Sequence, residues 1–196
     1  MHRYNLLALT VALGTALTVF AQAPQTPQSP QTQNRRASSA GMRSSDETFL
    51  KKAADGNMAE VQLGQLAQKN ASSDSVKQFG QRMVTDHSKM LDDIKNLAAS
   101  KGVTLPSSPA TKIKAAYNRL ASKAGAEFDK DYITTMVKDH NEDIAEFRKE
   151  AESGMDPDVK ALASQALPIL QEHLRMAQDC AKQLGISVSG GSPGNL

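Results

Sequence analysis

The pentapeptide "MVTDH" occupies residues 83–87, and the near copy "MVKDH" occupies residues 136–140. A third version, "ILQEH", ends at residue 173, so three of the four histidines in this 196-residue chain close one pattern. Each copy reads as two apolar residues, a variable residue, an acid and a histidine. Because residues three and four positions apart share a face of an α-helix, the pattern predicts three helices with one inward histidine each.

Apolar residues continue at helical spacing on both sides of these segments and predict four long amphipathic helices. The predicted ranges are about 46–70, 74–101, 126–153 and 157–184. A capping-box sequence, Ser44 to Glu47, opens the first, and Asp156 with Pro157 opens the fourth. A short helix over about 109–122 has room to cross over, which would leave the second and third long helices parallel. The predicted fold is therefore all-α, a four-helix bundle with a short crossover helix.

Both ends of the chain differ in composition from the helical region. Residues 1–23 have a short basic start, an apolar run and a small A-x-A site, which is typical of a cleavable secretory signal. A membrane anchor, the alternative, needs a longer apolar run. Residues 24–45 and 185–196 are poor in apolar residues and predict a flexible tether and a flexible tail. We therefore expect one bundle domain at 46–184, exported to the periplasm or envelope, with no transmembrane segment after cleavage.

The overall composition excludes several classes of protein. The net charge of +2 and an aromatic content of 4% give no basic surface for nucleic acid. The single cysteine, Cys180, cannot form an internal disulfide. The sequence contains no glycine-rich phosphate loop, serine elbow or Cys-x-x-Cys pair. These features favour a binding or structural protein over an enzyme.

The three histidines and one glutamate fall at a single level of the predicted bundle. Counted from the predicted loops at about 1.5 Å per residue, they lie within roughly one helical turn of each other. These four candidate ligands are Glu60, His87, His140 and His173. Three acids precede the histidines by one residue and point to the flanks, where they could hold imidazoles of adjacent helices. They are Asp86, Asp139 and Glu172, and Asp143 is an additional candidate ligand.

Two interpretations of this layer remain open. Three histidines and a carboxylate form a ligand set suited to zinc, iron or manganese. A hydrogen-bonded polar layer that fixes helix register would use the same residues without a metal. Copper(I) is a weaker alternative that rests on nearby methionines, which also fill gaps in ordinary cores. The methionines are Met83, Met90, Met136 and Met176.

Four blocks of the sequence resemble successive parts of the bacterial domain of unknown function numbered 4142. They are "GNMAEVQLGQLA", "VKQFGQRMVTDHSKML", "GAEFDKDYITTMVKDHNEDIAEFRKEA" and "DPDVKALASQALPILQEHLRMAQ". The resemblance implies a ferritin-like fold and an exported protein, often called an outer membrane protein, but no established activity. Ferritin-like di-iron sites carry Glu-x-x-His, whereas Val84, Val137 and Leu170 stand at the corresponding positions here. A single ion is therefore favoured over a di-iron centre.

Three functions are consistent with these features. The first is an envelope protein that binds one transition metal. The second is a metal-free helical module that interacts with an envelope partner or has a structural role. A metal-dependent oxidoreductase is the least favoured of the three.

Overall fold

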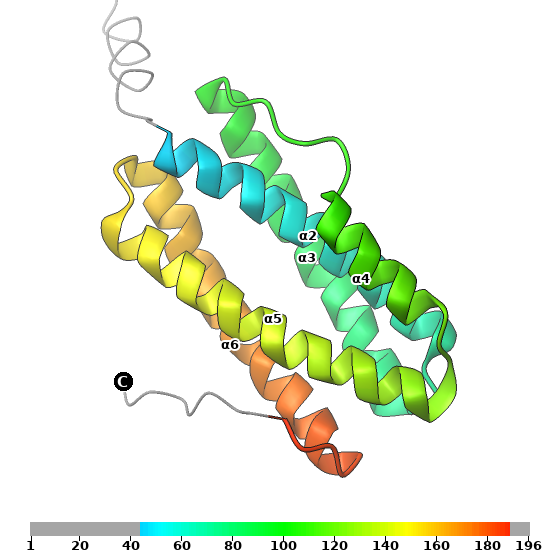
Figure 1. Ribbon diagram of the computed structural model, residues 1–196. Coiled ribbons are helices and arrows are strands. Elements are labelled where there is room, and N and C mark those ends of the chain that lie inside the picture. The colour runs from blue at the N-terminus through cyan, green and yellow to red at the C-terminus, as the bar shows by residue number, and fades with distance from the viewer. Residues whose placement is uncertain (1–43, 189–196) are drawn as a thin grey trace, which may run out of the picture.

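The computed structural model describes residues 44–188, which form helices without strands. The helices are α2 (Ser45–Asn70), α3 (Asp74–Lys101), α4 (Thr111–Ala121), α5 (Gly125–Ser153) and α6 (Pro157–Gln183). Figure 1 shows α2 packed with α3 and α5 packed with α6, and α3 also contacts α6. Within this range no helix is apolar over enough residues to cross a membrane. The predicted signal and almost all of the predicted tether lie outside the described residues.

The connection between α3 and α5 crosses over as predicted. An extended segment and α4 carry the chain along α2 to the opposite end of the bundle (Figure 1). At that end, the Ser72 N–H before α3 donates to Asp129 near the start of α5. At the other end, Lys101 of α3 pairs with Asp156 before α6. α3 and α5 therefore run parallel, which confirms the ferritin-like topology.

α2 begins at the predicted place, but the predicted capping box does not form. The Ser44 side chain makes no cap hydrogen bond, and Glu47 pairs with a lysine of its own helix. Asp46 is buried, and its carboxylate accepts hydrogen bonds from the N–H groups of Met155 and Asp156. The predicted capping box was wrong because Glu47 pairs with Lys51. The buried acid of this turn, Asp46, instead stabilises the distant α5–α6 loop, a contact that local sequence does not reveal.

Two glycines set the spacing where α2 and α3 cross. A Cβ atom added at Gly64 would lie 2.6 Å from the backbone oxygen of Gly80. One added at Gly80 would lie 2.7 Å from the Cβ of Ala67. Both distances are too short for any side chain, so only glycine allows the two helices to approach this closely. Gly56 differs, since an added Cβ there would have no neighbour within 4 Å.

The apolar core consists of two clusters of buried side chains. The first, here called the lower cluster, is centred on Phe79, Phe128 and Tyr132. The second, the upper cluster, is centred on Leu50 and Phe147. The three histidine positions separate the two clusters along the helices. Met83, one turn before the α3 histidine, belongs to the lower cluster, and Met90, one turn after it, to the upper cluster.

The residues that follow α6 pack against the helices. α6 ends at Gln183, but Ile186 and Val188 pack against the lower cluster as partly buried side chains. The rest of the predicted tail, residues 189–196, lies outside the described residues.

Candidate metal centre

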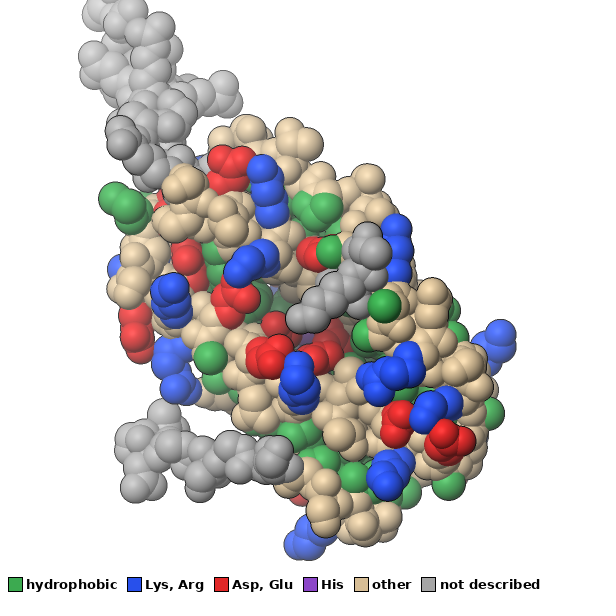
Figure 2. All heavy atoms as spheres, in the orientation of Figure 1, with side chains coloured by type: hydrophobic (Ala, Val, Ile, Leu, Met, Phe, Trp, Pro, Cys, Tyr) green, Lys and Arg blue, Asp and Glu red, His purple; other side chains and the backbone are tan. Residues whose placement is uncertain are grey.

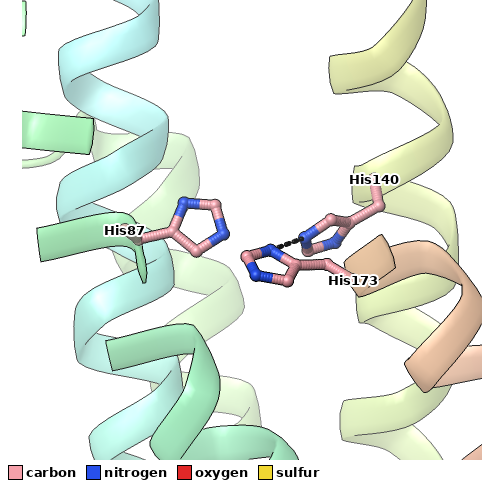
Figure 3. Close-up of side chains that lie close together, drawn as sticks. All are labelled: His87, His140 and His173. Atoms are coloured by element: carbon pink, nitrogen blue, oxygen red, sulfur yellow. Dashed lines mark hydrogen bonds between the residues drawn. The ribbon is translucent and has the colours of Figure 1, made fainter. Parts of the chain in front are cut away.

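α3, α5 and α6 each place one histidine in the middle of the bundle (Figure 3). His87, His140 and His173 are at most 1% exposed. One ring nitrogen of each lies within 4.8 Å of one ring nitrogen of each of the others. Glu60, which was predicted to join them from α2, is not part of this group. The structure therefore brings three of the four predicted ligands together.

Asn57 on α2 fixes the protonation of His87. The Asn57 Nδ2 group donates to the Ala53 carbonyl at 2.7 Å, so its Oδ1 is the atom that faces His87 Nδ1 at 3.0 Å. Because that oxygen can only accept, Nδ1 carries the hydrogen and Nε2 keeps a lone pair. His87 Nε2 is buried and has no hydrogen-bond partner within residues 44–188. The lone pair is therefore available to a ligand.

His140 and His173 are held in the same way from outside the layer. His140 Nδ1 donates to the Met136 carbonyl at 2.9 Å, and His173 Nε2 donates to Asp86 Oδ2 at 2.8 Å. The remaining nitrogens, His140 Nε2 and His173 Nδ1, face each other at 3.4 Å (Figure 3). In the neutral rings both of these atoms carry lone pairs. Neither can donate to the other in these tautomers, so a shared cation or an added proton would stabilise the pair.

A proton is disfavoured at this position because the rings are buried. Burial lowers the pKa of His140 to about 3, with a further contribution from His173. Burial and the two neighbouring rings also lower the pKa of His87 well below its ordinary value. Burial lowers the pKa of His173 despite its hydrogen bond to Asp86. At neutral pH the layer therefore presents unprotonated nitrogens, the form that binds metals.

The spacing of the rings suits a common ion. At a zinc–nitrogen distance of about 2.0–2.1 Å, two nitrogens of a tetrahedral site lie about 3.3–3.4 Å apart. The His140–His173 separation of 3.4 Å matches this value. The nitrogens of all three rings lie within 4.8 Å, so His87 would need only a small approach. The donor set and its spacing therefore fit a transition metal.

The three acids predicted beside the histidines differ in their contacts. Asp86 does hold an imidazole of an adjacent helix, that of His173, as predicted. Burial raises the pKa of Asp86, but hydrogen bonds from Arg82 and His173 outweigh it and lower the pKa overall. Glu172 accepts two hydrogen bonds from Arg175 of its own helix. Asp139 is half-buried, with a lysine Nζ 3.8 Å away.

Glu60 lies among carboxylates rather than among the histidines. It is 4% exposed, and its Oε2 has no hydrogen-bond partner in the described part of the chain. Burial and the nearby Asp143 and Asp139 raise its pKa well above the ordinary value. Burial and the charge of the nearby Glu60 raise the pKa of Tyr132. Glu60 therefore lines the same groove as the α5 carboxylates Asp139 and Asp143.

Asn57 is the functional residue that sequence analysis missed. It lies four residues after Ala53, an inward position of the first predicted helix, so a polar residue on the apolar face was the available signal. Its hydrogen bond to His87 makes α2 the fourth helix that contributes to the layer.

Comparison with known proteins places the chain in a sequence family and a fold. The sequence matches the family described as Domain of unknown function (DUF4142) over residues 31–180. None of the curated proteins compared with the chain matches it. The fold is similar to the crystal structure of a DUF305 protein from Streptomyces coelicolor that is named as secreted, with a TM-score of 0.64 and 13% identity. The match covers 80% of this chain and 99% of the other, and at that identity it establishes only the fold.

Proposed function

This chain belongs to the DUF4142 family, which is defined by a domain of unknown function, and we propose that it binds one transition-metal ion through His87, His140 and His173 after export. The observation that carries the proposal is the convergence of three ring nitrogens whose partners outside the layer leave each with an inward lone pair. Neutral imidazole suits zinc, iron and copper, and zinc or iron(II) fits best here. Met83 and Met90, which would favour copper(I), pack in the apolar clusters.

Export is supported by two observations. Residues 1–23 have the pattern of a secretory signal. The DUF305 protein with a similar fold is named as secreted. We place the mature chain in the periplasm or another envelope compartment, where the tether at residues 24–45 would let the bundle reach an envelope partner.

Hydrogen bonds with the surrounding residues fix the tautomers of the three rings in the absence of an ion. Asn57 and the Met136 carbonyl hold hydrogens on the outward nitrogens of two rings, and Asp86 does so for the third. Such outer contacts fix the tautomer and orientation of ligating histidines. Three protein nitrogens leave a position for solvent, and a bound ion would polarise an oxygen there as a Lewis acid. We assign no reaction to the site.

A metal-free structural layer is the alternative function. It is favoured by the same outward hydrogen bonds, which are complete without an ion. Buried polar contacts of this kind can fix the register of helices. The two functions predict different effects on metal binding and stability when one of the three imidazole rings is removed.

Titration of the mature chain with Co²⁺ tests the proposal, because cobalt bound by nitrogens absorbs visible light and can be displaced by Zn²⁺. We expect one equivalent per chain and a higher melting temperature with metal, since an ion that binds only the folded state stabilises it. His140→Ala should abolish both effects. Met90→Leu is the matched control, because it changes a buried side chain one turn from His87 but keeps every ligand.

Two results would reject the metal site. One is unchanged cobalt binding in His140→Ala. The other is equal destabilisation by His140→Ala with and without metal, which would support the structural layer.

A further inference from the structure

A small cavity reaches from the surface between α2 and α5 to the histidine layer. It has a volume of about 20 Å³, and His87, which is 1% exposed, forms part of its wall. Lys52 and Glu146 also line it, and their side chains are 63% and 41% exposed. We call this space the His87 cavity. It opens on the face of the bundle drawn in Figure 2, which shows acidic side chains gathered over its middle.

The His87 cavity lies against the upper side of the histidine layer. Asp143 lines it about one turn after His140 on α5. Leu170 lines it about one turn before His173 on α6 and belongs to the upper cluster. The cavity therefore borders one of the three rings and lies about one turn from the other two.

The size and polarity of the His87 cavity suit water. A space of about 10–15 Å³ holds one water molecule, so this cavity is too narrow for a fully hydrated ion. Its polar wall residues include Asn57, Asp143 and His87. His87 Nε2 is buried without a hydrogen-bond partner in the described part of the chain, and such an atom in a native protein usually indicates a water or an ion. Water, or an ion that has lost most of its hydration shell, therefore fits the cavity.

Gly56 is explained by the His87 cavity and not by helix packing. It lies inside α2, where glycine is less favourable than alanine. Unlike Gly64 and Gly80, it permits no close approach of helices, since an added Cβ would have no neighbour within 4 Å. Gly56 does line the cavity. A longer side chain at this position would therefore occupy the cavity or its mouth.

We propose that the His87 cavity is the passage through which water and a divalent transition-metal ion exchange between solvent and the three histidines, and that Gly56 keeps it open. This inference rests on the metal site proposed above and adds the route to it. The three rings are at most 1% exposed, so an ion needs either a passage or an opening of the bundle. A larger groove of about 640 Å³ between α3 and α6 reaches Asp86 but none of the three rings.

Stopped-flow mixing of the mature chain with Co²⁺ measures the rate of uptake, and transfer of the loaded protein to a chelator measures the rate of release. Gly56→Leu should slow both by about tenfold or more, which requires only about 1.4 kcal/mol of added barrier. Both rates should change by the same factor, because every ligand is kept and the equilibrium affinity stays the same. Gly56→Met, whose unbranched side chain adapts to irregular spaces, is a second variant with the same expected result.

Two control variants keep the His87 cavity open. Gln65→Leu adds a leucine at an exposed position of the same helix and should change neither rate. Gly56→Ala adds only a methyl group and favours helix, so it should also leave both rates nearly unchanged. If the ion instead entered by local unfolding, this stabilised variant would slow uptake as much as Gly56→Leu.

The outcomes separate the passage from the metal site. Equal rates in wild type, Gly56→Leu and Gly56→Met would overturn the passage and leave the metal site intact. Equal slowing by Gly56→Ala and Gly56→Leu would also overturn the passage, in favour of entry by bundle opening. Absence of Co²⁺ binding to the wild-type chain at equilibrium would overturn both the metal site and the passage.

Discussion

The buried imidazole of His140 should make the metal-free protein sensitive to acid in a predictable range. Its pKa lies at about 3 in the fold, against an ordinary value of 6.5. Below pH 6.5, His140 therefore binds a proton in the unfolded chain but stays unprotonated in the folded chain. Stability is lost as pH falls from 6.5 towards about 3. The sign is the same for His87 and His173, whose pKa values burial also lowers.

The size of the effect follows from linkage. Each pH unit between the two pKa values changes the free energy of unfolding by about 1.4 kcal/mol. About pH 5.0 is roughly 1.5 units below the pKa of His140 in the unfolded chain. Protonation of His140 in the unfolded chain should therefore lower the free energy of unfolding by about 2 kcal/mol relative to about pH 7.5. His140→Leu removes this contribution. Over the same pH range, the free energy of unfolding of the variant should therefore fall by about 2 kcal/mol less than that of the wild-type protein.

Urea unfolding followed by circular dichroism, with a chelator present, measures this difference at each pH. The variant will have its own stability at neutral pH because packing changes, so the quantity to compare is the change with pH. Equal changes in the two proteins would show that His140 already takes up a proton in the folded state. The layer would then not present three unprotonated nitrogens.

Further predictions concern packing and the interhelical loop. Gly64→Ala should destabilise the protein by about 1–3 kcal/mol, because its methyl group meets backbone 2.6 Å away. Gly56→Ala should stabilise it by roughly 0.5–1 kcal/mol, because that position is open and alanine favours helix; urea unfolding that gave the reverse order would contradict the role of the close crossing. Asp46→Ala should cost about 1–3 kcal/mol and speed hydrogen exchange at the Met155 and Asp156 amides, which lose their acceptor.

The helices and their order could be predicted from sequence because both depend on local patterns. Apolar spacing gave the helices, and the length of the segment before α5 predicted the crossover that Ser72 and Asp129 confirm. The convergence of the three histidines could be predicted because the height of a residue in a bundle can be counted along its helix. Height does not fix rotation about the helix axis, however. Glu60 is not part of the histidine group, and it lines a groove together with Asp139 and Asp143.

Contacts between distant segments were beyond sequence reasoning. Asp46 and Asp129 look like ordinary acidic residues near the start of a helix, yet each accepts hydrogen bonds from backbone N–H groups of another part of the chain. Asn57 has no local feature that identifies its partner, which lies thirty residues away on α3. Such pairings depend on how helices face one another, which a periodic pattern does not encode.

The separation of the apolar core by the histidine layer bears on how the bundle opens. The lower and upper clusters are distinct networks, joined at the periphery by Leu174, which packs against both. Without metal, we expect the two halves to behave as separate cooperative units with different free energies of opening, which native-state hydrogen exchange would resolve. An ion held by His87, His140 and His173 would tie α3, α5 and α6 together at the boundary. Amide protection in both halves would then rise together, and metal would act as a control on cooperativity as well as on stability.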